Sequence, residues 1–302
     1  MSSTDPRPLV TVTRHGDGGH VAELALDRPE AMNAVSTAMA RDLGAACAAL
    51  AADETVRCVV VTSTSPKAFC VGADLKERNS FTDADLMAQR PVARAAYGGV
   101  LNLPVPALAV VEGFALGGGL EIALSCDLVI AGENAVVGLP EVSVGVIPGG
   151  GGTQLLTRRV GWSRAAGMIF TARRMPAAEA GALGVVDEVV PAGAARARAM
   201  EIAAGIAANS PVGVSRQRQR RLPCGRRRTP SHASNRPPPP ARWRGRRRLR
   251  AASPAWPGAD PPASWRRSRR RSPSPGPARL PPAPPRPPPR ARRPRRPAPG
   301  GP

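Results

Sequence analysis

Apolar and polar residues alternate in two short segments near the start of the chain, residues 10–13 and 21–27, and this period of two predicts β-strands. The HGDGG segment between them, residues 15–19, is rich in turn-forming residues, so we expect a hairpin. Residues 37–52 then carry Ala and Leu at helical spacing, directly after Ser36, a residue type that commonly caps a helix. A strand pair and a helix are therefore expected to open the fold.

Strands and helices continue to alternate up to about residue 208. Continuous apolar runs predict strands at residues 56–62, 106–112, 127–131, 135–138 and 185–190. Helices are expected at about 83–101 and 120–126, after a four-glycine loop at 149–152, and finally up to 208. Thr153 is expected to cap the helix after the glycines, and residues 63–74 are expected to form a loop. This order predicts an α/β fold.

The composition changes abruptly near residue 213. Residues 214–302 hold 26 Arg, no Lys, a single acid and 24 of the 36 Pro, whereas residues 1–213 hold 17 basic and 21 acidic side chains. The net charge of +21 therefore combines a mildly acidic body, residues 1–212, with a strongly basic tail, residues 213–302. Such a tail buries too little apolar area to offset the entropy of ordering it, so we expect it to be disordered.

Two hypotheses account for the tail. Its Arg, Pro, Ala and Gly are residues whose codons can be written in G and C alone, and the chain has 41 Arg against two Lys, so an out-of-frame reading of a GC-rich gene is one hypothesis. The alternative is a genuine basic tail. Its Arg runs would bind phosphate backbones nonspecifically, and Trp243, Trp256 and Trp265 would stack on bases.

Several classes of protein are disfavoured by what the sequence lacks. The five Cys include no C-x-x-C pair, which argues against a zinc site or a disulfide framework and favours reduced thiols in the cytoplasm. No signal peptide and no apolar run of membrane-spanning length is found, so no membrane partner is expected. None of the three His has a catalytic context, and the glycine runs fit neither a P-loop nor a dinucleotide fingerprint.

Two acids in glycine-rich, apolar surroundings remain as candidates for chemistry. Glu121 lies in GGGLEIAL, and Glu141 lies in GLPE. Partial desolvation raises the pKa of a carboxyl and prepares it for proton transfer near neutral pH. The glycines before Glu121 remove Cβ atoms where a strand turns into a helix, so backbone N–H groups there can approach a carbonyl oxygen. Residues 69–74 form a second small-residue turn, and Asp74 is expected to cap the helix after it.

Three separated segments resemble the signatures of the crotonase (enoyl-CoA hydratase/isomerase) superfamily. They are residues 68–77 (AFCVGADLKE), residues 113–127 (GFALGGGLEIALSCD), and residues 139–154 (LPEVSVGVIPGGGGTQ). The match runs over about residues 9–210 in the family's order and spacing. The first and third segments are most similar to the methylglutaconyl-CoA hydratase branch, which hints at short or branched acyl chains. The resemblance implies a spiral of repeated ββα units, similar to ClpP.

The resemblance also implies roles for particular residues. The amides matching Ala73 and Gly118 would hold the thioester oxygen, and the carboxyls matching Glu121 and Glu141 would add water to a 2-enoyl-CoA. Contacts with the substrate or its coenzyme A part are implied for Ala31, Asn33, Gly72, Asp74, Lys76 and Gly117. No cofactor beyond the substrate's own coenzyme A is implied. Both acids are present, which favours a hydratase, a lyase of fatty-acid metabolism, because the family's isomerases usually lose the first one.

Two alternatives to the hydratase remain open. One is another reaction of the superfamily, above all enoyl-CoA isomerisation. The other is an inactive scaffold whose basic tail binds nucleic acid. The family also forms trimers or dimers of trimers through three amphipathic helices that follow residue 210 or so. Residues 213–302 do not match those helices, which argues against the oligomer.

Overall fold

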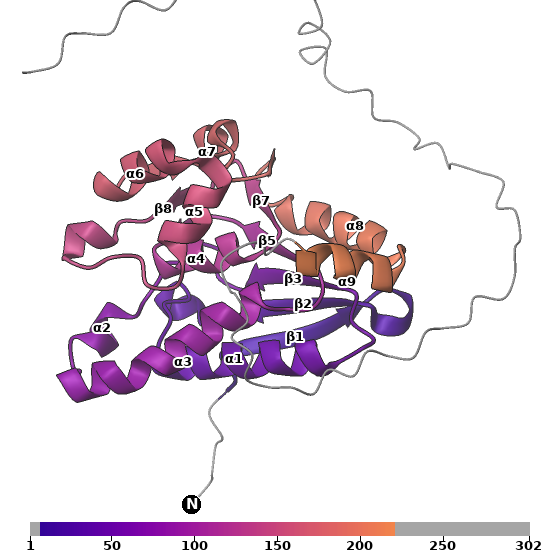
Figure 1. Ribbon diagram of the computed structural model, residues 1–302, viewed down its shortest axis with the longest axis horizontal. Helices are drawn as coiled ribbons and strands as arrows, with labels where there is room; N and C mark the ends of the chain where they lie inside the picture. The colour runs from indigo at the N-terminus through magenta and orange to yellow at the C-terminus, as the bar shows by residue number, and fades with distance from the viewer. Residues whose placement is uncertain (1–6, 221–302) are drawn as a thin grey trace, which may run out of the picture. The chain divides into compact units, whose positions relative to one another are not determined.

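Two β-sheets organise residues 7–220, the part of the chain that the computed structural model describes (Figure 1). In the larger sheet β1 pairs antiparallel with β2, and the other neighbours are parallel. Its strands, in spatial order, are β1 (Val10–His15), β2 (Val21–Leu26), β3 (Cys58–Ser63), β5 (Ala107–Val111), β7 (Leu128–Gly132) and β10 (Glu188–Val190). The smaller sheet contains β4 (Ala68–Cys70), β6 (Phe114–Leu116), β8 (Val136–Gly138) and β9 (Arg174–Pro176).

From β3 to β8, successive strands along the chain alternate between the two sheets. β3, β5 and β7 enter the larger sheet, and β4, β6 and β8, which follow them, enter the smaller one. Each such pair leads into helical structure before the next pair begins. The predicted α/β class is confirmed, and the recurring pair of strands supplies the repeat of the predicted spiral.

Nine α-helices lie within residues 7–220. They are α1 (Thr37–Ala52), α2 (Leu75–Arg78), α3 (Asp83–Leu101), α4 (Gly118–Ser125), α5 (Gly152–Val160), α6 (Trp162–Phe170), α7 (Ala177–Leu183), α8 (Ala195–Ala207) and α9 (Pro211–Arg220). Three short 3₁₀ helices cover Asp17–Gly19, Pro29–Ala31 and Glu141–Val144. Among the described residues no helix is long and apolar enough to cross a bilayer.

The larger sheet is covered on both faces, as buried parallel strands require. One face packs on the main core, to which α1, α3 and α4 contribute; α1 and α3 lie side by side in Figure 1. The other face packs on α8 through four alanines at a spacing of four residues, Ala195, Ala199, Ala203 and Ala207. These small side chains let the helix backbone approach the alternating apolar residues of the strands closely.

A charged pair joins α8 back to the N-terminal hairpin. Glu23 of β2 is buried and accepts hydrogen bonds from Nε and Nη2 of Arg196 at 2.7 and 2.6 Å. Thr62 and His15 also contact the carboxylate. The hydrogen bond from Arg196 is the main cause that holds the pKa of Glu23 below its ordinary value, against the opposing effect of burial. A buried carboxylate is tolerated here because every side of it is paired.

The last described helix is anchored by an arginine. Arg218 of α9 donates from Nε to Asp127 at 2.7 Å and from its two terminal nitrogens to the carbonyls of Leu103 and Leu101. Those carbonyls lie at the C-terminal end of α3, where free carbonyl groups favour a cation. The helix α9 therefore crosses the boundary expected at residue 212. Residues 221–302, on which the predictions about the basic tail fall, lie outside the described residues.

Most predicted elements are confirmed, and three local expectations are corrected. Ser36 caps α1 by accepting from Met39 N, as predicted. Residues 63–74 are not a simple loop, because the buried segment Ala68–Cys70 pairs with β6. The stretch before residue 185 contains β9 in addition to helices. Thr153 does not cap α5, since that helix begins at Gly152 after Gly151.

Candidate functional site

Two glycine loops from different repeats meet at the centre of the site. A Cβ atom built on Gly72 would lie 2.9 Å from the nitrogen of Gly118, so the two backbones are in contact there. Gly72 has φ +90° and Gly117 has φ +54°, conformations that side chains with a Cβ rarely adopt. Glycine at both positions therefore serves close approach of two chains and the turn from β6 into α4.

The predicted oxyanion donors are both available. Neither the amide of Ala73 nor the amide of Gly118 donates a hydrogen bond to any described residue. The backbone hydrogen bonds near Ala73 are made by the residues on either side of it. Val35 N donates to Gly72 O, and Asp74 N donates to Val35 O. Gly118 is the first residue of α4, where N–H groups have no partner within the helix. The two free donors lie on touching loops, an arrangement that can hold one carbonyl oxygen.

Glu121 lies in the first turn of α4 and is 3% exposed. Its Oε1 accepts from the amides of Gly150 and Gly152 at 2.8 and 2.7 Å. Burial is the largest cause of its raised pKa, and the hydrogen bonds from the glycine loop oppose that effect. The four-glycine loop thus holds Glu121 through two of its amides.

Glu141 is the first residue of the 3₁₀ helix after β8, and its environment is different. Both of its carboxylate oxygens are buried and have no hydrogen-bond partner among the described residues. Its pKa is raised to about 7, chiefly by burial and in part by the negative charge of Glu121, and its own backbone amide opposes the shift. A Cβ on Gly117 would lie 3.3 Å from Glu141 Oε1, which places this carboxyl against the same turn that carries the Gly118 amide.

Two residues at this site were not found from the sequence. Tyr97, the single tyrosine of the chain, is a buried residue of α3, and a Cβ on Gly118 would overlap its hydroxyl. A Cβ on Gly150 would lie 2.8 Å from its ring. Arg78, the last residue of α2, is close enough to lower the pKa values of Tyr97 and Glu121 electrostatically. Neither residue belongs to a glycine motif, and only the rarity of tyrosine in this chain was a usable signal.

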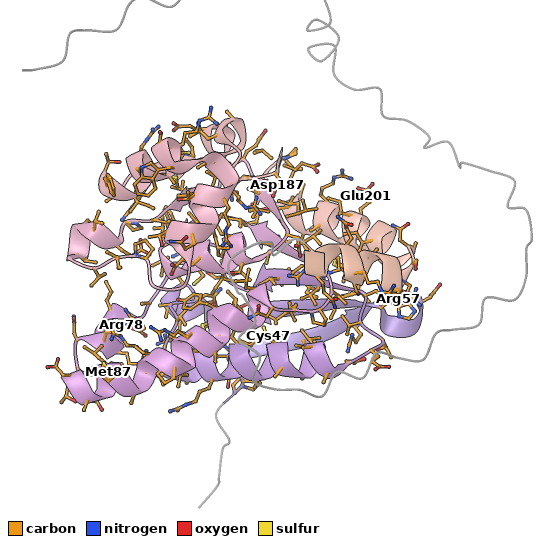
Figure 2. All side chains as sticks on the ribbon, viewed as in Figure 1. Cys47, Arg57, Arg78, Met87, Asp187 and Glu201 are labelled. Carbon is orange, nitrogen blue, oxygen red and sulfur yellow. The ribbon has the colours of Figure 1, made fainter. Side chains whose placement is uncertain are left out.

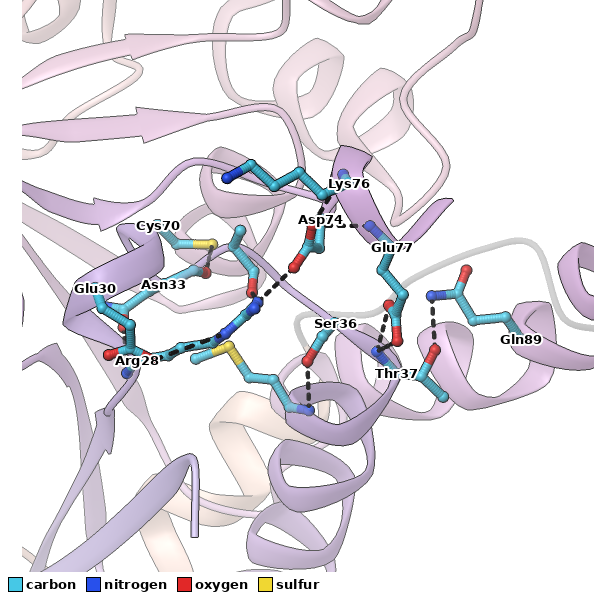
Figure 3. Close-up of polar contacts among 12 residues, drawn as sticks. Arg28, Glu30, Asn33, Ser36, Thr37, Cys70, Asp74, Lys76, Glu77 and Gln89 are labelled. Atoms are coloured by element: carbon cyan, nitrogen blue, oxygen red, sulfur yellow. Dashed lines mark hydrogen bonds and ion pairs between the residues drawn. The ribbon is translucent and has the colours of Figure 1, made fainter. Parts of the chain in front are cut away.

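The loop before α1 is fixed to the loop before α2 by a polar network, which Figure 3 shows. Asn33 is fully buried and donates to Ser63 Oγ at 2.7 Å and to Phe69 O at 3.0 Å. Its own Oδ1 accepts from the amide of Arg28, whose side chain donates to Asp74 at 2.6 Å. The Asn33 side chain is thus used inside the protein, where it sets the shape of the loop.

Asp74 caps α2, as predicted, by accepting from the amides of Lys76 and Glu77 at 3.0 and 3.1 Å (Figure 3). Burial alone would raise the pKa of Asp74, but the hydrogen bonds from Arg28 and from the two amides lower it below its ordinary value. Lys76 is exposed, and Ala31, in the 3₁₀ helix, is half-buried. These positions leave Lys76 accessible to a large anionic ligand outside the buried site.

The described residues contain no group of three or more His, Cys, Asp or Glu that could hold a metal ion. Cys47, Cys58, Cys70 and Cys126 are buried, and burial raises the pKa of each thiol. A buried thiol with a raised pKa is a poor nucleophile. The chemistry of the site therefore rests on two carboxyls, two amides and the groups beside them.

The chain is similar to known proteins over most of its described residues. The family model for enoyl-CoA hydratase/isomerase matches residues 16–220. YngF of Bacillus subtilis, described as an enoyl-CoA hydratase/isomerase, is 43% identical over 195 residues, which cover 65% of this chain and 75% of YngF. Human mitochondrial methylglutaconyl-CoA hydratase is 38% identical, covering 64% of this chain and 58% of that protein. The crystal structure of an enoyl-CoA hydratase from Bacillus anthracis matches with a TM-score of 0.66 and 37% identity, covering 70% of this chain and 81% of that one.

Proposed function

The chain belongs to the enoyl-CoA hydratase/isomerase family, and from this premise we propose that it adds water across the C2–C3 double bond of a 2-enoyl-CoA to give a 3-hydroxyacyl-CoA. The observation that carries the proposal is the placement of two buried carboxyls beside two unused amides on touching loops. Membership of the family supports a reaction on an acyl-CoA. The presence of both acids favours hydration among the family's reactions.

In the proposed reaction the thioester oxygen accepts hydrogen bonds from the amides of Ala73 and Gly118. These donors stabilise the negative charge that develops on this oxygen when the double-bond electrons move away from C3. Because the donors are fixed by the fold before substrate binds, little reorganisation is needed during the reaction. Negative charge on the thioester oxygen is greater in the transition state than in the substrate, so the contact favours the transition state.

The two glutamates divide the proton transfers. Glu121, stabilised as the anion by the amides of Gly150 and Gly152, takes a proton from water as the water oxygen forms its bond to C3. Glu141, whose pKa of about 7 leaves about half of it protonated at pH 7, gives its proton to C2. The substrate gains one hydrogen and one hydroxyl. Proton exchange between the pair and solvent restores the starting state.

The test is incubation of the purified full chain with crotonyl-CoA, followed by chromatographic identification of the product. Formation of 3-hydroxybutyryl-CoA at a rate above that of the Glu121→Gln, Glu141→Gln double variant supports the proposal. A second incubation with a 3-enoyl-CoA separates the isomerase alternative, because an isomerase would yield the 2-enoyl-CoA as its main product. No turnover of either substrate by a folded chain would support the inactive scaffold instead.

A further inference from the structure

The four-glycine loop that binds Glu121 has little conformational restriction of its own. Glycine allows a wider range of backbone conformations than other residues, and Gly151 has φ +115°. The amides of Gly150 and Gly152 can therefore hold Glu121 in one place only if another part of the chain fixes the backbone that carries them. Gly152 is the first residue of α5, so the position of the loop depends on that helix.

Helix α5 packs against α4 and is joined to it at both ends. At the N-terminal end, Gly152 N donates to Glu121 in the first turn of α4. At the other end, Arg159 Nη2 donates to the carbonyls of Cys126 and Asp127 at 3.4 and 3.3 Å, just past the last turn of α4, where a cation is favoured. The two helices therefore run in the same direction, with Glu121 bound at one end and Arg159 at the other.

Arg159 is also held by an ion pair. Its Nη1 donates to Asp187 at 2.7 Å, and the same carboxylate oxygen accepts from the amide of Val129, in β7, at 2.8 Å. Figure 2 labels Asp187 near β7. The Arg159 side chain is only 13% exposed, so solvent screens its contacts less than those of an exposed pair. Arg159 thus fastens α5 to the segment that connects α4 with β7.

The other side chains of α5 make no comparable link. Arg158, next to Arg159, is exposed and makes no hydrogen bond or ion pair with any described residue. The hydroxyl of Thr157 donates within the helix, and Leu156 and Val160 pack in the apolar core. Apolar packing is not directional, so it opposes separation of the helices more than a change in their relative orientation. Within residues 7–220, the directed contacts from α5 side chains to other elements are those of Arg159.

We propose that Arg159 is a positioning residue of the site, because it fixes the C-terminal end of α5 and thereby holds the amides of Gly150 and Gly152 against Glu121. Its effect on a reaction rate rests on the proposed hydration, whereas its effect on the surroundings of Glu121 does not. Arg159 contacts no reacting atom, and it acts through the glycine loop.

The loss of Arg159 should change how readily Glu121 ionises. When the loop amides move away, the buried carboxylate loses hydrogen bonds that favour its charged form, so it keeps its proton up to a higher pH. The other charged or titratable groups at this place are Arg78, Tyr97 and Glu141, and a substitution of Arg159 leaves all three present. In the proposed hydration the base would then become available only at higher pH.

The test compares the full chain with Arg159→Met and with two matched controls. Arg158→Met removes the neighbouring charge. Arg57→Met removes a contact of the same kind elsewhere, because Arg57 donates to the carbonyl of Ala207 at the end of α8, at 3.0 Å (Figure 2 labels Arg57). The titration is followed by NMR with carboxyl-labelled glutamate, and the Glu121 signal is the one missing from Glu121→Gln. Glu121 should titrate at higher pH in Arg159→Met and should not change in either control.

Arg159→Lys keeps the charge but lacks the planar group that donates in two directions, so it should shift the Glu121 titration the same way by a smaller amount. With crotonyl-CoA, Arg159→Met should lower kcat by about tenfold and move the acidic limb of kcat/KM to higher pH. The alkaline limb, which Glu141 sets, should stay in place. Both controls should keep kcat within about twofold of the wild type.

An unchanged Glu121 titration in folded Arg159→Met would overturn the inference, and Arg159→Lys decides the question in the same way if the methionine variant does not fold. An equal shift in Arg57→Met would also overturn it, because a general loosening of the fold would then explain the change. The two proposals fail separately. A shifted titration in a chain that hydrates nothing defeats the hydration alone, and hydration with an unshifted titration defeats the positioning role alone.

Discussion

Glu121 and Glu141 are the same residue type at one site, yet the chain surrounds them differently. Glu121 lies in a helix and is held by two backbone amides of the four-glycine loop. Glu141 lies at the start of a 3₁₀ helix, and neither of its buried oxygens has a partner among the described residues. Hydrogen bonds stabilise the ionised form, whereas burial without them favours the neutral form. The difference shows how one fold can give two neighbouring glutamates different tendencies to ionise.

Removing either carboxyl is the change expected to lower the rate of hydration most. General acid–base groups typically contribute about 10²–10⁴-fold to a rate, so Glu121→Gln and Glu141→Gln should each lower kcat for hydration within that range. The double variant should lose little more than the worse single variant, because the two groups act in one reaction. Steady-state rates with crotonyl-CoA measure this. Near-wild-type turnover by either variant would contradict the proposal that both glutamates transfer protons.

The pH dependence of hydration should reveal which glutamate is the acid. Because the pKa of Glu141 is about 7, the protonated form that donates to C2 is lost as the pH rises through that value. We therefore expect kcat/KM for the wild type to fall above pH 7 by up to about tenfold per pH unit. A Glu141→Gln variant has no such proton to lose, so its residual activity should not show this decline. A rise in wild-type kcat/KM between pH 7 and 9 would reverse the assignment.

The glycine loop offers a way to disturb the surroundings of Glu121. A Cβ on Gly150 would lie 2.7 Å from Glu121 Oε2 and 2.8 Å from the Tyr97 ring, so Gly150→Ala must displace one of them. A shift of a few tenths of an ångström in a catalytic group is expected to lower kcat by about tenfold. Gly149→Ala is the matched control, because its Cβ would meet only Ile147 O at 4.0 Å. Equal rates for the two variants would contradict a role for the glycine loop in positioning Glu121.

Stability should respond to Glu141 in a way that depends on pH. Its folded pKa of about 7 exceeds its ordinary value of 4.5, so the unfolded chain loses the proton first and the wild type becomes less stable as the pH rises from about 4.5 to 7. Glu141→Gln cannot ionise. Relative to the wild type, it should gain roughly 1–2 kcal/mol of unfolding free energy at pH 8, after discounting for screening by solvent, and little at pH 4.5.

Urea titrations of both proteins at the two pH values measure this difference. Glu121→Gln serves as the comparison, because two amides already stabilise the Glu121 anion and the gain there should be smaller. A gain for Glu141→Gln that is equal at both pH values would mean that packing, and not charge, separates the variant from the wild type.

Features that depend on neighbouring residues, such as helix caps, were predictable from the sequence. Features that depend on contacts between distant segments were not. Ser36 and Asp74 were identified as caps because a cap depends only on the next few residues. The three-residue strands β4 and β9 were missed, since they are strands only through pairing with β6 and β8. Thr153 was assigned a cap that Gly151 occupies, because the glycine loop must deliver its amides to Glu121 before α5 begins.

The residues of the candidate site were also predictable only where the signal was local. Glu121 and Glu141 stand out in sequence because glycine and proline surround them, whereas Tyr97 and Arg78 sit in ordinary helical segments. Tyr97 and Arg78 belong to the site because α3 and α2 lie near the glycine loops. No local sequence pattern predicts that tertiary arrangement. The contact between the Gly150 amide and Glu121 likewise depends on tertiary structure.

The pairing of Glu23 with Arg196 has a consequence for synthesis of the chain. The two residues are separated by 173 positions, so the ribosome has made both Glu121 and Glu141 long before Glu23 can meet its partner. β10, which covers the edge of β7, also follows them. A nascent chain that stops between residues 141 and 188 therefore contains the candidate catalytic groups together with a Glu23 carboxylate that lacks its arginine and an open strand edge. Exposed edges of this kind favour aggregation, so release of the chain at such a point would yield aggregate in place of enzyme.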